Sequence, residues 1–254
     1  MTILLFVCVG VALGLALGLF GGGGGILAVP LLLAVGVPPD EAATTSLVVV
    51  AAAAVGGVIP HVRVGRVAWR EGLTFGAIGI PAAMLGSVLA LNTADAVKLF
   101  GFTALMLVAG GLMLRKALRS DGADPDADRP RRSWAAIIAV AAVVGLVTGF
   151  FGVGGGFLVV PALALVIGLP MRIATATALV VIVINSAGAM VPRLGEAFDP
   201  AASAVVALAA VITTALAARW SNRWSGKALG VGFAILVLVM AGVTAFEAWS
   251  LVSA

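Results

Sequence analysis

The chain has 254 residues, of which 62% are hydrophobic and only 10% are charged, and its mean hydropathy is +1.22. A water-soluble domain is excluded, because ordinary globular chains carry about 25% charged residues and need that polar surface to face water. The net charge of +4 does not indicate a nucleic-acid partner, because the basic residues lie between apolar stretches, where they report membrane orientation.

Apolar segments follow one another along the whole chain. They lie at about 2–20, 26–36, 42–60, 72–91, 97–114, 134–151, 157–169, 173–192, 201–218 and 228–246. Most approach the ~20 residues that cross a bilayer core, but 26–36 and 157–169 would reach only about 16 to 20 Å as helices. Each of these two follows a glycine run, and we interpret them as half-helices. The sequence therefore predicts an all-α, polytopic membrane protein.

A polar stretch divides the chain near its centre. Residues 115–133 carry six basic and four acidic side chains together with Pro125 and Pro130. We predict a polar cytoplasmic linker here, between a first transmembrane repeat (1–114) and a second transmembrane repeat (134–254).

The two halves repeat one motif. Gly18–Pro30 (GLFGGGGGILAVP) aligns without gaps on Gly149–Pro161 (GFFGVGGGFLVVP), with nine of thirteen positions identical. After one inserted residue the register continues and pairs Gly36 with Gly168 and Thr45 with Thr177. Two homologous repeats in a membrane are typical of transporters.

The path of the chain at the glycine runs decides how the repeats are oriented. If each run only interrupts one long helix, the repeats are parallel and ten basic residues face one side and five the other. If each run is a hairpin, the repeats are inverted and the split becomes thirteen to two, with Lys98 and Arg193 outside. The second split fits the positive-inside rule better. We favour inverted repeats, each with a glycine-broken half-helix hairpin and three spanning helices.

The glycine runs also predict a binding site. Glycine disfavours helix by about 1 kcal/mol relative to alanine, so we expect unwound backbone, which is tolerated at membrane depth only inside protein or beside water. Each run precedes a half-helix N-terminus, whose free amides and dipole attract anions. The predicted substrate contacts are Gly21, Gly23, Gly24, Gly25, Gly152, Gly154, Gly155 and Gly156. The alternative is close helix packing, which we expect for Gly10, Gly14 and Gly18.

Small polar side chains follow the glycine runs. Thr45 and Ser46 in the first half and Thr177 in the second can donate to an oxyanion without bringing charge into lipid. Their alternative role is to bond the carbonyl one turn back in their own helix. Asn185 lies eight residues after Thr177, within about 80° of it on a helix, and either lines the cavity or links helices.

Catalytic and metal-binding patterns are missing from the sequence. The carboxylates fall in loops or near span ends, so no buried proton relay is visible. His61 is the single histidine and Cys8 the single cysteine, which leaves no metal cluster and no intrachain disulfide. We expect no enzyme activity, no metal and no cofactor.

At the duplicated motif the chain resembles the TauE/SafE family of sulfite and organosulfonate exporters. The first half carries Gly21, Gly23–Gly25, Pro30 and Thr44–Leu47; the second carries Gly152, Gly154–Gly156, Pro161 and Ala176–Leu179, with Ala178 in place of the serine. The resemblance covers nearly the whole chain. It implies a transporter of small sulfur-containing or related organic anions in the cytoplasmic membrane.

Three functions remain in competition. The first is a secondary transporter, acting as an exporter, that binds small anions between two half-helix N-termini. The second is a passive anion channel on the same scaffold, and the third is a membrane accessory subunit without transport. The expected partners are a small anion and the lipid bilayer, with no nucleic acid; a homo-oligomer is left open.

Overall fold

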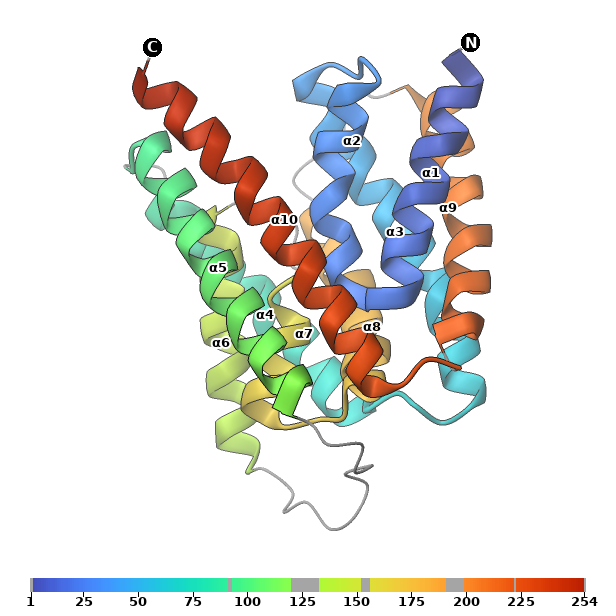
Figure 1. The fold of residues 1–254 in the computed structure, drawn as a ribbon, viewed down its shortest axis with the longest axis vertical. Helices are drawn as coiled ribbons and strands as arrows, with labels where there is room; N and C mark the ends of the chain where they lie inside the picture. The colour runs from blue at the N-terminus through green and yellow to red at the C-terminus, as the bar shows by residue number, and fades with distance from the viewer. Residues whose placement is uncertain are drawn as a thin grey trace.

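The structure is a computed structural model and describes residues 2–90, 93–119, 133–151, 156–190, 199–221 and 223–253. Within these ranges it is all-helical (Figure 1). Eight segments of this part of the chain are long and apolar enough to cross a membrane, and many large apolar side chains on their outer faces are exposed. This arrangement is that of a multi-pass membrane protein, as predicted.

The first glycine run reverses the chain. Helix α1 (Thr2–Phe20) runs from the end of the molecule that holds both chain ends toward its middle, and α2 (Ala28–Ala34) runs back (Figure 1). The reversal occurs at Gly21, whose φ of +63° lies in the left-handed region that favours glycine. The sequence therefore forms a hairpin here and not one long interrupted helix.

The backbone of this run is not unwound. Gly21–Leu27 forms the 3-10 helix η1, which leads directly into α2, so the prediction of irregular backbone is wrong for the first run. Gly21, Gly22, Gly23 and Gly24 are all buried in it. Glycine is required here because neighbouring backbone and rings lie where side chains would be, and this close packing offsets its low helix propensity.

The second half also contains short helical segments after its first long helix. Helix α6 (Trp134–Phe151) leads to α7 (Val159–Pro161) and to a π-helix, η2 (Ala162–Ile167). The short segments of the two halves end alike, at Gly36 with φ +87° and at Gly168 with φ +84°. Gly152, Gly154 and Gly155, predicted to contact substrate, lie outside the described residues.

Three long helices follow each short segment. They are α3 (Pro39–Arg63), α4 (Trp69–Ala90) and α5 (Asp95–Arg119) in the first half, and α8 (Met171–Met190), α9 (Pro200–Ser221) and α10 (Gly226–Ser253) in the second. Helix α5 continues through Arg115 and Lys116, so the predicted linker begins inside this helix.

Glycines let helices of the two halves approach closely. A Cβ at Gly10, Gly14 or Gly18 of α1 would lie within 2.7 Å of backbone or Cβ atoms of α9, which confirms the packing role predicted for these three. In the same way a Cβ at Gly149 of α6 would lie 1.9 Å from the carbonyl oxygen of Ala83 in α4. The core is correspondingly divided, with one cluster around the first hairpin and another around α5, α7, η2 and α10.

Candidate functional site

The glycine runs of the two halves meet. A Cβ at Gly22 would lie 1.9 Å from the carbonyl oxygen of Gly156, and one at Gly156 would lie 2.8 Å from the carbonyl oxygen of Gly22. At Gly22 and Gly156 the two glycine runs therefore contact each other through main-chain atoms. A site built here would consist of main-chain amides and carbonyls, since neither glycine brings a side chain.

The other glycines of the first run face different elements. A Cβ at Gly21 would lie 2.4 Å from the carbonyl oxygen of Thr175 in α8, and one at Gly24 would lie 2.3 Å from the backbone nitrogen of Leu17 in α1. At Gly23 it would meet the ring of Phe233 in α10, at 2.7 Å. Gly23 and Gly24 therefore pack against neighbours, which is the alternative that the sequence left open.

Gly25 differs from its neighbours. The nearest heavy atom to a Cβ there is Val50 Cγ1 of α3, at 3.8 Å, which is an ordinary van der Waals contact. A side chain would fit at this position. Gly25 thus offers a matched control for the crowded glycines of the same run.

Aromatic rings and glycines hold the two hairpin tips in the same way. Phe20 ends α1 and lies 2.6 Å from the position of a Cβ at Gly232 in α10. Phe151 ends α6 and lies 3.2 Å from the position of a Cβ at Gly101 in α5. Phe102, next to Gly101, also contacts the ring of Phe151, at a centroid distance of 5.6 Å and an interplanar angle of 48°. Each tip is therefore held by the last helix of the opposite half.

The predicted hydroxyl residues are buried but do not converge on one pocket. Thr45 Oγ1 accepts a long hydrogen bond from Ser203 Oγ of α9, at 3.4 Å. Thr177 Oγ1 accepts the backbone N–H of Ala68, just before α4, at 3.0 Å. Ser46 is also buried, on α3. Each of the two matched threonines thus contacts the beginning of a helix from the opposite half, at opposite ends of the molecule.

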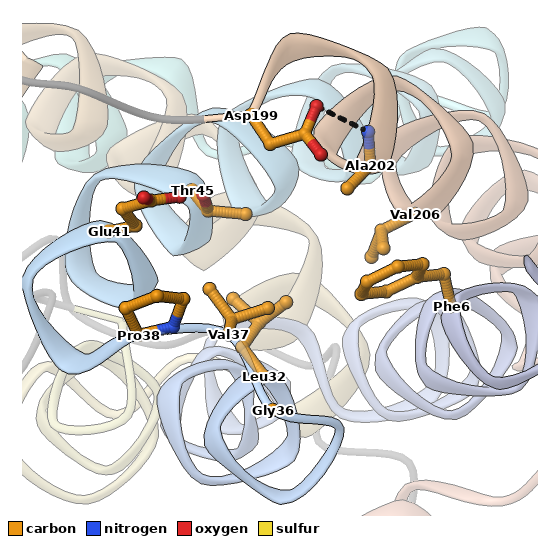
Figure 2. Close-up of a pocket in the computed structure, with 10 residues that line it drawn as sticks. All are labelled: Phe6, Leu32, Gly36, Val37, Pro38, Glu41, Thr45, Asp199, Ala202 and Val206. Atoms are coloured by element: carbon orange, nitrogen blue, oxygen red, sulfur yellow. Dashed lines mark hydrogen bonds between the residues drawn. The ribbon is translucent and has the colours of Figure 1, made fainter. Parts of the chain in front are cut away.

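A pocket of about 150 Å³ lies beside Thr45 (Figure 2). Its walls come from α1, α2, the turn after α2, α3 and α9, and they are mostly apolar. Glu41 and Asp199 supply two carboxylates. Asp199 Oδ1 accepts the N–H groups of Ala201 and Ala202, at 2.8 and 3.2 Å, and so caps α9. Of the predicted site residues that the structure describes, Thr45 alone lines this pocket.

Asn185 faces α4 from α8. A Cβ at Gly79 of α4 would lie 3.3 Å from Asn185 Oδ1, and this buried oxygen has no hydrogen-bond partner. An Asn that links two helices needs such a partner, because an unsatisfied buried acceptor costs about 1–3 kcal/mol. The geometry is therefore poor for helix linkage and leaves Oδ1 available.

Two features of the site were missed by sequence reasoning. Gly22 was passed over because its counterpart in the repeat is Val153, and Ser203 because no motif marks it. The unbroken run of five glycines was the signal available for Gly22. In the described part of the chain, no three His, Cys, Asp or Glu residues gather where they could hold a metal ion.

Comparisons with known proteins agree with a membrane transporter. A relative from Xylella fastidiosa, named "Probable membrane transporter protein", is 36% identical over 113 residues, covering 44% of this chain and 43% of the relative. A relative of the same description from Methanocaldococcus jannaschii is 25% identical over 137 residues, covering 54% and 49%. The chain thus spans about half the length of the curated relatives it matches.

No solved structure matches the chain. The family model described as "Sulfite exporter TauE/SafE" matches residues 6–244, which is nearly the whole chain. The apolar helices, the hairpin at the glycine run and this match lead to one conclusion: the protein is a multi-pass membrane protein of the sulfite exporter TauE/SafE family.

Proposed function

We propose that the protein is a secondary transporter that exports small anions such as sulfite or organosulfonates. The observation that carries this proposal is the meeting of the two glycine runs at Gly22 and Gly156. Bare backbone can approach an oxyanion closely, and amides at the start of a helical segment carry partial positive charge. An anion held in this way needs no buried cation.

The two halves are inverted repeats in this proposal. Support comes from reciprocal packing: α1 lies on α9 as α6 lies on α4, and α10 receives Phe20 as α5 receives Phe151. The first hairpin also enters from the end of the molecule opposite to the one at which α6 begins (Figure 1). Two inverted repeats can exchange their conformations, so that the protein opens first to one side of the membrane and then to the other. This exchange is the basis of alternating access.

The charge distribution gives the protein an orientation. Among the described residues, every Arg and Lys except Lys98 lies at the end where α3, α5 and α9 finish and α4, α8 and α10 begin. We assign this end to the cytoplasm by the positive-inside rule. The pocket at Thr45 then faces the outside.

Helix α3 contributes both to the outer pocket and to the surroundings of the first glycine run. Thr45 lines the pocket, and Val50, five residues later on α3, contacts Gly25. Five residues correspond to a rise of about 7.5 Å along a helix. We assign the pocket as an outer vestibule, and we place substrate contacts at Gly22 and Gly156, at Thr45, Ser46 and Thr177, and at Asn185.

The test is an uptake panel with purified protein in liposomes, over sulfite, sulfate, sulfoacetate and simple carboxylates, with the membrane potential clamped. We expect saturable flux of one or more of these anions that responds to the potential, because moving one charge across 100 mV is worth about 2.3 kcal/mol. Flux that does not saturate would indicate a channel. No flux of any anion under any gradient would indicate an accessory subunit and end the proposal.

A further inference from the structure

Three contacts link η2 and α8 of the second half to neighbouring elements at the end that we assign to the cytoplasm. Arg172 donates from Nε and Nη2 to the carbonyl oxygen of Trp224, at 3.1 and 2.6 Å. Lys116, at the end of α5, donates to the carbonyl oxygen of Ala164 in η2. Thr177 accepts the N–H of Ala68. The partners lie in or beside α4, α5 and the α9–α10 connection, so these contacts bind three separate elements together.

The matching end of the first half is arranged differently. The repeat register pairs Gly36, Pro38, Glu41 and Thr45 with Gly168, Pro170, Ile173 and Thr177. The first four line the outer pocket, whereas Thr177 is fully buried and hydrogen-bonded. Arg172 corresponds to Asp40 in this register, so the guanidinium contact to Trp224 is a feature of the second half. At the outer end a pocket lies between the elements, whereas at the counterpart end Gly168, Leu169 and Pro170 are half-buried and side-chain contacts of Arg172, Lys116 and Thr177 cross between the elements.

We infer that Arg172, Lys116 and Thr177 form a cytoplasmic closure, and that a second pocket matching the outer one opens around Leu169 when their contacts break. The inference rests on the proposed function, since it takes the two ends of the transporter to open in turn. Arg172 and Lys116 are positioning residues: they hold α8 and η2 against neighbouring elements. Both make charge-assisted hydrogen bonds to carbonyl oxygens, which are about twice as strong as neutral ones.

The second pocket would differ from the outer one in charge. Glu41 is replaced by Ile173 in the register, and the guanidinium of Arg172 can turn to an anion once it releases the carbonyl oxygen of Trp224. A small anion would therefore find a cation at the cytoplasmic mouth and two carboxylates at the outer mouth. This difference favours capture of anions from the cytoplasm.

The test uses single cysteines in a Cys8→Ala background, one at Val37 of the outer pocket and one at its counterpart Leu169. A membrane-impermeant maleimide is applied from the outside for Val37→Cys and from the cytoplasmic side, in inside-out vesicles, for Leu169→Cys. Into each background we introduce Arg172→Ala with Lys116→Met. Arg223→Ala serves as a control, because Arg223 is exposed in the connection that contains Trp224 and its substitution removes one positive charge from the same end of the molecule.

We expect the double substitution to raise labelling at Leu169→Cys about tenfold and to lower labelling at Val37→Cys, because losing contacts of one state shifts the population to the other. Arg172→Lys, which keeps a donor, should restore part of the difference, and Arg223→Ala should change neither rate. Unchanged labelling, or a rise at both cysteines together, would overturn the closure. The assay needs no transported substrate, so a reciprocal shift without flux would contradict the proposed function and leave the closure standing.

Discussion

Gly22 and Gly25 belong to one glycine run but have opposite surroundings. A Cβ at Gly22 would overlap the Gly156 carbonyl, whereas one at Gly25 would make an ordinary contact with Val50. What a glycine contributes is thus set by the atoms that stand where its side chain would be. At Gly22 those atoms belong to the other half of the chain, so the residue joins the two repeats.

Asn185 gives a prediction at this scale. Asn185→Leu keeps a similar shape and removes the buried Oδ1 that has no partner, so we expect the thermal midpoint in detergent to rise, by the equivalent of about 1–3 kcal/mol. If Asn185 contacts the substrate as proposed, anion flux should fall in the same variant. A lower midpoint with normal flux would show instead that Asn185 links helices.

The residue types near the site were predictable from the sequence, but their partners were not. The predicted register pairs Gly36 with Gly168 and Thr45 with Thr177; the glycines have φ values of +87° and +84°, and both threonines accept a hydrogen bond from the other half of the chain. Gly22 was missed because its counterpart in the register is Val153, and nothing in the sequence indicates that Gly22 lies against the carbonyl oxygen of Gly156. Which atoms a residue faces depends on helices far away in the chain, and no local pattern encodes this.

Helix pairs across the two halves depend on small residues. In α1 and α6 the glycines that face α9 and α4 have backbone or Cβ atoms of the partner within 3 Å of where their Cβ would be. Without a hydrophobic driving force between helices in lipid, this close contact is the main source of association. The sequence already indicated such packing at Gly10, Gly14 and Gly18, because a spacing of four residues places these glycines on one face of a helix.

Substitutions in these pairs test the element-scale account. We expect Gly14→Ala and Gly149→Ala to lower the thermal midpoint, because each forces a helix pair apart at a cost of about 1–3 kcal/mol. Gly111→Ala in α5 and Gly242→Ala in α10 are the matched controls, since nothing lies within 4 Å of a Cβ at either position. Equal effects in all four variants would show that close contact does not hold these helices.

The 3-10 conformation of the first glycine run could not be predicted from propensity. Five glycines in a row favour irregular backbone in isolation, and their helical state depends on α1, α8 and α10 packing around them. The hairpin itself followed from charge counting, which favoured a returning chain over one long helix. Charge thus predicted the path, whereas packing decided the local conformation.

At the scale of the whole molecule, each half holds the hairpin of the other. Phe20 packs on Gly232 of α10 and Phe151 on Gly101 of α5, while α1 and α6 lie on α9 and α4. The halves therefore exchange helix contacts across the molecule. A half alone would expose these faces.

This exchange predicts the behaviour of a divided chain. If the chain is cut between residues 124 and 125 and both pieces are co-expressed, we expect them to co-purify and to keep much of the flux, because no described contact between helices is cut. Either piece expressed alone should aggregate or be degraded. Stable, monodisperse single pieces would mean that the halves fold independently and that the reciprocal contacts are secondary.

The most direct test of the central claim, that the meeting glycine runs hold the anion, is the initial rate of sulfite or sulfonate flux against concentration in proteoliposomes at clamped potential. We predict saturable flux for the wild-type protein and for Gly25→Ala. We predict that Gly22→Ala loses flux even when the purified variant is monodisperse in detergent and therefore folded. Wild-type kinetics in folded Gly22→Ala would contradict the account.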